Sequence, residues 1–213
     1  MEHQGLRLDG VRIALGPREL IAISHDVAPG EVLTVMGPSG SGKSTLLAYV
    51  GGFLDKAFTA SGCVLSGDLD LTALPPRERH VGILFQDPLL FPHMSVAGNL
   101  LFAIPQQVKG RLARKAIAEE ALAGVDLADM GARDPDTLSG GQKARVALAR
   151  VLVSAPRALL LDEPFSKLDA DLRHQMRQLV FAKARDSGLP VILVTHDEAD
   201  ATAAGGAIIR IGA

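Results

Sequence analysis

A glycine-rich segment that ends in lysine, serine and threonine is the part of the sequence best suited to bind phosphate. Its residues are Gly37, Pro38, Ser39, Gly40, Ser41, Gly42, Lys43, Ser44 and Thr45. An apolar, β-branched run (32–36) precedes it and a helix-like run (45–50) follows, the order that a phosphate-binding loop requires. A flexible linker would need neither this order nor the terminal lysine. We expect the loop amides and Lys43 to bind phosphates, and the Ser44 hydroxyl to ligate Mg²⁺.

Three apolar runs that read as core strands each end in polar residues. The carboxyl ends of parallel strands meet at one edge of an open α/β sheet, where ligands bind. We therefore expect the polar residues after these strands to lie at that edge. They are Gln86 after the run 81–85, Asp162 and Glu163 after the run 158–161, and His196 after the run 190–195.

The two carboxylates and the histidine have separate expected roles. Asp162 can hold the Mg²⁺ that Ser44 also contacts, whereas Glu163 can orient or deprotonate an attacking water. His196 can hydrogen-bond a γ-phosphate and that water. In isolation, Asp162, Glu163 and Pro164 would equally suit a turn or a helix N-cap, and a single histidine in a turn is commonly structural. The phosphate loop upstream favours the functional interpretation.

A second glycine-containing segment indicates another phosphate contact. Ser139, Gly140, Gly141 and Gln142 open an amphipathic run that extends to Val153. Two glycines in a first turn weaken a helix, but they leave its N–H groups accessible to a phosphate. The structural alternative is an ordinary serine N-cap. Because one chain needs one γ-phosphate site, a second phosphate contact suggests that this segment binds the nucleotide of a different molecule.

Composition and charge exclude several classes of protein. The chain has 213 residues, of which 47% are hydrophobic and 22% charged, as in a folded domain with a substantial core. The net charge of −2 provides no basic excess for nucleic acid. No apolar stretch approaches the roughly 20 residues of a membrane span, and Met1–Gly5 lacks signal-peptide features. The single cysteine, Cys63, excludes an intrachain disulfide and fits a reducing cytoplasm.

The hydrophobic pattern predicts an α/β fold with a helical insertion. Expected strands cover 6–17, 20–27, 32–36, 61–67, 69–71, 81–85, 158–161, 190–195 and 208–211. One helix is expected to begin near Lys43, and three more are expected over 111–123, 140–153 and 170–184. The largely helical stretch 87–155 interrupts the α/β alternation and is expected to form a subdomain. Arg77 and Arg79 are expected in a solvated surface turn.

Together these segments resemble the nucleotide-binding domain of the ATP-binding cassette (ABC) family over nearly the whole chain. The matching motifs, in family order, are the Walker A loop (Gly37–Thr45), the Q-loop (Gln86), the LSGGQ signature (Leu138–Gln142), the Walker B strand with its catalytic glutamate (Leu159–Glu163), the D-loop (Ser166–Asp169) and the switch histidine (His196). The resemblance implies a P-loop NTPase (RecA-like) core with an N-terminal antiparallel β-subdomain and an inserted α-helical subdomain (87–155), within one domain spanning 1–213.

The resemblance also implies cofactors and a pairing of two copies. ATP and Mg²⁺ would be bound, with Ser44, Gln86 and Asp162 around the metal. Two copies would form a head-to-tail homodimer in the ATP-bound state, so that Ser139–Gln142 of one copy contacts the γ-phosphate held by the other. ATP binding would close this pair and hydrolysis would let it open.

Finer similarity points to importers. The segment 85–96 is similar to the Q-loop region of ATPases for sulfate, iron, polyamine, thiamine or maltose-type uptake. Its Leu89, Leu90 and Phe91 are expected either to receive a short helix from a membrane subunit or to fold into the core. The implied partners are transmembrane permease subunits and, indirectly, a periplasmic substrate-binding protein, at the cytoplasmic face of the bacterial inner membrane. The alternatives are an exporter ATPase and a soluble ABC ATPase acting on DNA or ribosomes.

Three features depart from the family pattern. Leu15 occupies the hairpin position that usually carries an adenine-stacking aromatic residue, and no aromatic residue precedes Tyr49. We therefore expect weaker adenine affinity, poor discrimination of ATP from GTP, or a substitute contact. Lys167 occupies a D-loop position where small or amide residues are common. The sequence ends at Ala213 without the extra β-domain of sugar-type importers, which disfavours a regulated maltose-like transporter.

Overall fold

The computed structural model describes residues 4–212 and divides into two compact units. The first comprises the residues up to Ile83, Arg157–Glu163 and the residues from Phe181 onward; the second comprises Leu84–Pro156 and Pro164–Val180. The expectations for the two ends of the sequence concerned Met1–Gly5 and Ala213. Of these residues, Met1–His3 and Ala213 lie outside the described range. No helix within 4–212 has the length and apolarity that crossing a membrane requires.

The first unit contains a four-stranded antiparallel sheet in the order β2-β1-β4-β5. Its strands are β1 (Leu6–Leu15), β2 (Arg18–Val27), β4 (Phe58–Ser66) and β5 (Leu69–Asp70). In β1, Leu6, Leu8, Val11 and Ile13 are buried and the residues between them are exposed, so the alternation in the sequence marks the core face. The strand β4 starts earlier than the expected residue 61, because its first residues pair with the end of β1.

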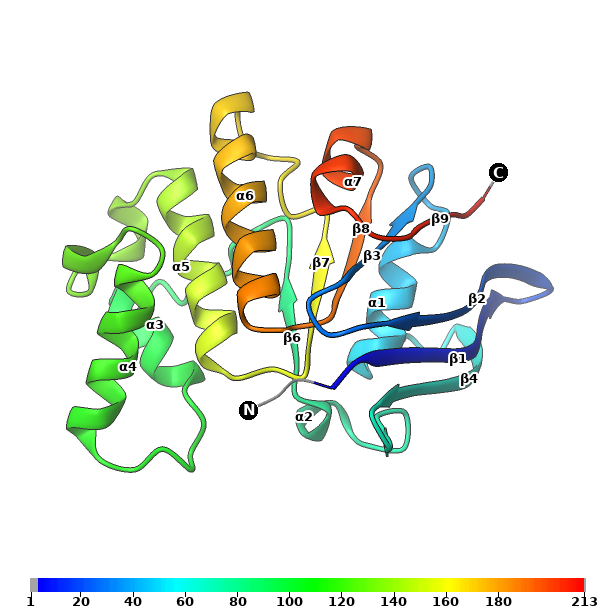
Figure 1. Cartoon of the computed structure of the whole chain (residues 1–213), viewed down its shortest axis with the longest axis horizontal. Coiled ribbons are helices and arrows are strands. Elements are labelled where there is room, and N and C mark those ends of the chain that lie inside the picture. Colours follow the sequence, from blue (N-terminus) through cyan, green and yellow to red (C-terminus); the bar gives the residue numbers. More distant parts are fainter. Residues whose placement is uncertain (1–3, 213) are drawn as a thin grey trace. The chain divides into compact units, whose positions relative to one another are not determined.

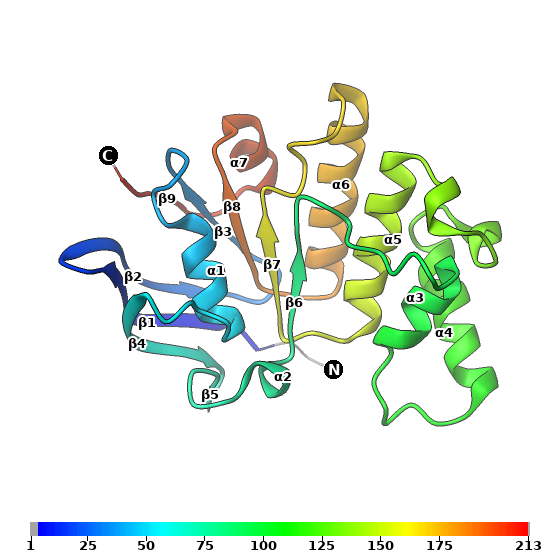
Figure 2. The same ribbon diagram turned by 180° about the vertical axis from the view of Figure 1, so that it is seen from behind.

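The first unit also carries the larger, five-stranded sheet, in the order β6-β7-β8-β3-β9 (Figures 1 and 2). Its strands are β6 (Val81–Leu84), β7 (Ala158–Asp162), β8 (Val191–Thr195), β3 (Val32–Met36) and β9 (Ile208–Arg210). The pairs β7–β8, β8–β3 and β3–β9 are parallel. All residues of β3 and β8 are buried, including Thr34 and Thr195, as their largely apolar runs predict. The helix α1 (Lys43–Gly51) packs against β7 and β8, and α7 (Glu198–Ala204) packs against β8 and β3.

Arg79 corrects the expectation of a wholly solvated turn. It ends the short helix α2 (Pro76–Arg79) and is only 7% exposed. Its guanidinium donates to the carbonyls of Tyr49 and Val50 in the last turn of α1, and to those of Thr72 and Leu74. Burial lowers the pKa of Arg79, and the carbonyl groups replace the water that its charge loses. Its neighbour in the turn, Arg77, is exposed as expected.

The second unit is mainly helical. Its elements are α3 (Val96–Ala103), α4 (Arg111–Ala123), the short helices η1 (Ala128–Met130) and η2 (Pro135–Thr137), α5 (Gly140–Val153) and the first part of α6 (Ala170–Asp186). The helices α3, α4 and α5 pack pairwise against one another. The helices expected over 111–123 and 140–153 are confirmed at those bounds.

Candidate functional site

The loop between β3 and α1 is shaped to receive an anion. Its Gly42 is the N-cap of α1, with a φ of 98° and no side-chain cap, so the first-turn N–H groups are left for another acceptor. A Cβ at Gly37 would lie 2.5 Å from the carbonyl oxygen of Ile211, so this position also requires glycine. Ser41 Oγ is buried and has no hydrogen-bond partner within 4–212, which makes it a further donor for a bound oxyanion.

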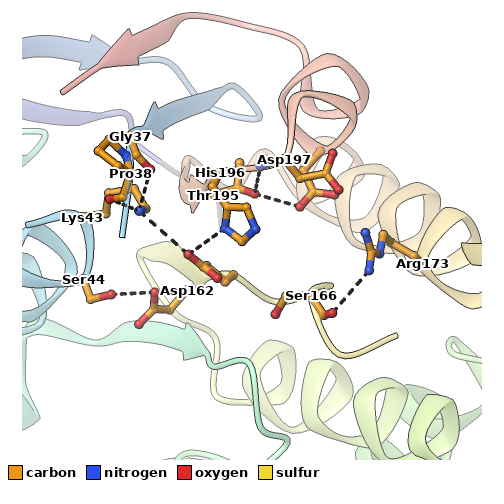
Figure 3. A network of polar contacts seen from close by, with 12 residues as sticks. Gly37, Pro38, Lys43, Ser44, Asp162, Ser166, Arg173, Thr195, His196 and Asp197 are labelled. Carbon is orange, nitrogen blue, oxygen red and sulfur yellow. Dashed lines mark hydrogen bonds and ion pairs between the residues drawn. The ribbon is translucent and has the colours of Figure 1, made fainter. Parts of the chain in front are cut away.

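Lys43 lies across this loop. Its side chain is 5% exposed, and Nζ donates to the carbonyl oxygens of Gly37 (2.8 Å) and Pro38 (3.0 Å) (Figure 3). The same Nζ lies 3.9 Å from Oε1 of Glu163. The positive charge is thus held between the loop and the carboxyl end of β7, where it can neutralise phosphate oxygens.

Ser44 and Asp162 bring a hydroxyl and a carboxylate together. Ser44 Oγ donates to Oδ1 of Asp162 at 2.9 Å, although the two residues are 118 positions apart in the sequence. Burial raises the pKa of Asp162, while the hydrogen bond from Ser44 lowers it and the neighbouring charge of Glu163 raises it again. A carboxylate that has lost part of its hydration is strongly stabilised by a cation bound next to it.

The oxygen atoms of Ser44 and Asp162 fit Mg²⁺. Magnesium prefers hard oxygen ligands and usually takes one or two from the protein, with phosphate and water completing its shell. Within 4–212 no group of three or more His, Cys, Asp or Glu side chains could hold a metal ion. The donor set is therefore that of a metal that arrives with a phosphate ligand rather than that of a closed protein site.

Glu163 and His196 lie within contact distance of each other. Nδ1 of His196 is 3.1 Å from Oε1 of Glu163, and the two side chains are 57% and 24% exposed. Glu163 has a φ of 46°, in the left-handed region that non-glycine residues rarely adopt, and its N–H donates to the carbonyl of Val194 in β8. The neighbouring strands β7 and β8 thus bring the two side chains together.

The turn that carries His196 is stabilised by hydrogen bonds that were not predicted from the sequence. Thr195 Oγ1 donates to Oδ2 of Asp200, which is 3% exposed, and accepts from the N–H of Asp197. Asp197 in turn caps α7 by accepting from the N–H of Ala199. The signal was available, because a threonine before the histidine and an aspartate after it are common N-cap and turn formers.

Gln86 and the signature segment belong to the second unit. Gln86 is exposed just after β6. Ser139 caps α5 in a reciprocal capping box: its Oγ accepts from the N–H of Gln142, whose Oε1 accepts from the N–H of Ser139. Gly140 is exposed, and a Cβ there would meet nothing within 4 Å, whereas one at Gly141 would lie 2.6 Å from the Leu172 methyl groups.

The capping box leaves donors for a ligand. A serine hydroxyl that accepts one hydrogen bond still has its proton to donate, and the amide nitrogen of a glutamine is separate from the oxygen used in the cap. Ser139 and Gln142 are therefore held in place while their donor groups stay available. The geometry fits a phosphate contact at the start of α5.

Lys167 forms an ion pair within the second unit. Its Nζ lies 2.6 Å from Oδ1 of Asp87, the residue after Gln86. Both side chains are more than half exposed, so the pair contributes little to stability. It nevertheless ties the segment after β7 to the segment after β6.

The hairpin position Leu15 is exposed, at 46%. It ends β1, and its partners across the strands are Arg18 in β2 and Phe58 in β4. Phe58 is partly buried against the core and is the aromatic residue that the register brings next to Leu15. It is therefore the first candidate for the substitute adenine contact.

Comparisons with known proteins agree with this geometry. Residues 20–166 match the family model described as "ABC transporter". An "Uncharacterized ABC transporter ATP-binding protein YnjD" of Escherichia coli K12 is 47% identical over 87% of this chain and 85% of its own length. A "Putative 2-aminoethylphosphonate import ATP-binding protein PhnT" of Salmonella typhimurium is 42% identical over 92% of this chain. A "Spermidine/putrescine import ATP-binding protein PotA" of Vibrio cholerae is 41% identical over 92%.

Coverage of the relatives is uneven. This chain spans 53% of the length of PhnT and 52% of the length of PotA, about half of each relative. A solved structure, described as the dimeric post-hydrolysis state of the ATP-binding cassette MJ0796 bound to ADP and Pi, matches with a TM-score of 0.78 and 30% identity. That match covers 97% of this chain and 94% of the other, which confirms the predicted α/β architecture.

Proposed function

This chain belongs to the ABC transporter family, and we propose on that premise that it is the ATP-hydrolysing subunit of an importer. The observation that carries the proposal is the convergence of Lys43, Glu163 and His196 beside the Ser44–Asp162 pair. A phosphate loop, a metal-binding pair of oxygens, and a carboxylate next to a histidine are the groups that ATP hydrolysis needs. The match to a cassette bound to ADP and Pi supports the same reaction.

Each side chain has a proposed role in hydrolysis. The loop amides of 37–45 and Lys43 hold the β- and γ-phosphates, and Ser44, Gln86 and Asp162 hold Mg²⁺. The metal, when bound, neutralises charge on the phosphate oxygens. Glu163 Oε1 accepts a hydrogen bond from the attacking water and polarises it. His196, which contacts the same carboxylate, positions the water and the γ-phosphate.

The signature segment is proposed to serve a second copy of the chain. Ser139 Oγ, the exposed Gly140 N–H and the amide of Gln142 present donors at the N-terminus of α5, and a helix N-terminus favours a phosphate. The resulting pair is a head-to-tail homodimer with one ATP between the phosphate loop of one copy and Ser139–Gln142 of the other. The dimeric state of the matching cassette supports this arrangement.

The segment after Gln86 is proposed to contact the permease. Leu89 is 58% exposed and Phe102 is 66% exposed, and the ring of Phe102 packs edge-on against Phe91 at 5.1 Å. Exposed apolar side chains on one unit are suited to receive an apolar partner helix. Leu90 and Phe91 are partly buried, so the expected surface is carried mainly by Leu89 and Phe102.

Import rather than export is favoured by the names of the relatives PhnT and PotA, both described as import ATP-binding proteins. The proposed assembly has two copies of this chain on the cytoplasmic face of the bacterial inner membrane, held there by permease subunits. A periplasmic substrate-binding protein would act on the chain only through the permease. An exporter ATPase and a soluble ABC ATPase are the alternatives.

The variant Glu163→Gln tests the hydrolytic part. It keeps the shape of the side chain but removes a general base, so turnover should fall by about 10²–10⁴-fold while Mg²⁺–ATP still binds and produces a dimer. Steady-state ATPase assays and light scattering of the eluting protein would measure the two properties. Hydrolysis at the wild-type rate would show that Glu163 is not the base.

A reconstitution test separates the transport alternatives. The chain would be purified with its membrane subunits in lipid nanodiscs, and its ATPase rate measured with a panel of loaded periplasmic binding proteins. Stimulation by one of them supports import. Stable association with the membrane subunits but no response to any binding protein would favour export, and no association would favour a soluble role.

A further inference from the structure

The segment Pro88–Phe91 of the second unit is held in an unusual conformation. Leu89 has a φ of 46°, although a branched residue strongly disfavours the left-handed region. Its side chain is 58% exposed, so packing of that side chain does not explain the conformation. Contacts to the backbone of the segment must therefore hold it.

Arg150 supplies those contacts from α5. Its Nη1 donates to the carbonyl of Leu89 at 2.7 Å, its Nη2 donates to the carbonyl of Pro88 at 3.1 Å, and its guanidinium carbon lies 5.6 Å from the centre of the Phe91 ring. Burial lowers the pKa of Arg150. Two hydrogen bonds and a cation–π contact to one short segment use the planar fork of arginine in a way that lysine cannot reproduce.

Asn99 of α3 fixes the downstream end of the segment. It is fully buried, accepts from the N–H of Phe91, and donates to the carbonyls of Phe91, Met94 and Ser95. The backbone around Leu89 is thus fastened to two helices, while the leucine side chain points outward. Movement of α5 would carry this backbone with it, because Arg150 joins the two.

The other end of α5 carries the signature segment. The helix runs from Gly140 to Val153 and is 14 residues long, which corresponds to about 20 Å at a rise of about 1.5 Å per residue. Ser139 caps its first turn and Arg150 lies in its last turn. A single rigid helix therefore links the proposed phosphate contact to the proposed permease contact.

We propose that Arg150 is a positioning residue that couples the nucleotide contact at the start of α5 to the permease contact at Leu89. It does so by fixing the carbonyls of Pro88 and Leu89 to the last turn of the helix. This inference rests on the proposed function, because it requires both an ATP-dependent contact at Ser139–Gln142 and a permease that docks on Leu89. Arg150 itself is not expected to touch ATP or the reacting atoms.

Matched variants on the same helix test the coupling. Arg150→Lys keeps the positive charge but loses the planar guanidinium that donates two hydrogen bonds. Arg150→Ala removes both the charge and the hydrogen bonds. The control is Arg145→Ala, because Arg145 also lies on α5 and bonds Val125, Asp126 and Gln175, residues outside the Pro88–Phe91 segment. Each change is made in the full chain, alone and with Glu163→Gln, so that the ATP-bound state accumulates.

Hydrogen–deuterium exchange of the peptide covering 86–94 is the first measurement. In the Glu163→Gln chain we expect Mg²⁺–ATP to change the exchange of this peptide. Either Arg150 variant should raise exchange without nucleotide by about tenfold, as loss of about 1.4 kcal/mol of local stability would, and should abolish the response to Mg²⁺–ATP. The Arg145→Ala chain should keep the response. An unchanged response in Arg150→Lys would overturn the inference.

The second measurement is ATPase activity with the membrane subunits that co-purify with the wild-type chain. Arg150→Lys should keep the basal rate and the KM for ATP of the isolated chain, but its stimulation by the membrane subunits should fall by about tenfold or more. Full stimulation of Arg150→Lys, or equal loss in Arg145→Ala, would overturn the inference alone. If the wild-type chain shows neither ATP-dependent dimerisation nor stimulation, the proposed function fails and the inference with it.

Discussion

Nδ1 of His196 lies 3.1 Å from Oε1 of Glu163, although the two residues follow different strands of the sheet. The contact is made while the carboxylate also lies 3.9 Å from Nζ of Lys43. A carboxylate that contacts a histidine and a lysine has few orientations left. As the proposed base, Glu163 would therefore have its orientation set before any substrate binds.

We expect His196→Ala to reduce turnover by about 10²–10⁴-fold with little change in ATP affinity. Because His196 and Glu163 are proposed to act on the same water, the double variant His196→Ala/Glu163→Gln should be only slightly slower than the slower single variant. Single-turnover hydrolysis and equilibrium ATP binding would measure both quantities. Losses that multiply in the double variant would indicate that the two side chains act independently.

Asp162 predicts a pH-dependent effect on stability. Its pKa is raised above the ordinary value of 3.8, chiefly by burial, so the folded protein binds this proton more tightly than the unfolded chain. The contribution of Asp162 to stability therefore falls as the pH rises from 3.8 through the raised pKa, and it is fully lost above that pKa. Asp162→Asn removes this titration and should be more stable than wild type at neutral pH without nucleotide.

The stability that Asp162→Asn gains over wild type should decrease as the pH falls toward 3.8. Thermal unfolding of both chains across this pH range, without nucleotide or Mg²⁺, would measure it. With Mg²⁺ and ATP the order should reverse, because the variant loses a metal ligand and gains less from binding. A variant less stable than wild type at neutral pH without ligand would contradict the argument.

Gly140→Ala should change stability and function in opposite directions. A Cβ there meets nothing within 4 Å, and alanine restricts the unfolded chain, so folding stability should rise by about 0.4–1 kcal/mol. The same Cβ would cover N–H groups proposed to bind the second copy's phosphate, so ATP-dependent dimerisation should weaken. Urea unfolding and sedimentation with Glu163→Gln would show the two effects, and unimpaired dimerisation would exclude a close phosphate contact.

The exposed Leu15 predicts poor base selectivity. Turnover and KM should be comparable for ATP and GTP in the wild-type chain. Leu15→Tyr should strengthen ATP binding by about 1–3 kcal/mol, the binding free energy that an aromatic stacking contact contributes. Nucleotide competition assays would measure both. A hundredfold preference for ATP in the wild-type chain would contradict the expectation. In that case, loss of the preference in Phe58→Leu would identify Phe58 as the substitute contact.

Much of the first unit could be predicted from the sequence, because its signals are local and strong. The run before Asp162 is wholly apolar, and the runs before Gly37 and His196 are apolar except for Thr34 and Thr195. Such near-continuous apolar runs are typical of buried parallel strands. Arg79 was assigned wrongly because a charge normally indicates exposure, and only the fold shows the carbonyls that surround it. The hydrogen bond that Asp200 accepts from Thr195, the residue before His196, likewise follows from the fold and from no sequence pattern.

The second unit was harder to predict. The helix α3 is apolar on several sides and shows little amphipathic contrast, although Ser95, which accepts from the N–H of Gly98, was a usable N-cap signal. A charged residue on a helix normally lies on the solvent side, yet Arg150 is half-buried over Phe91. Periodicity identifies which face of a helix is apolar, but it does not identify a charged side chain that bonds to a distant carbonyl.

The left-handed backbone of Glu163 places catalysis and thermal stability in opposition at one position. Its φ of 46° costs on the order of 1–2 kcal/mol for any residue with a Cβ, and glycine would avoid that cost. A laboratory selection for heat resistance alone should therefore enrich glycine at position 163. The surviving chains would fold better and would have discarded the side chain proposed to activate water.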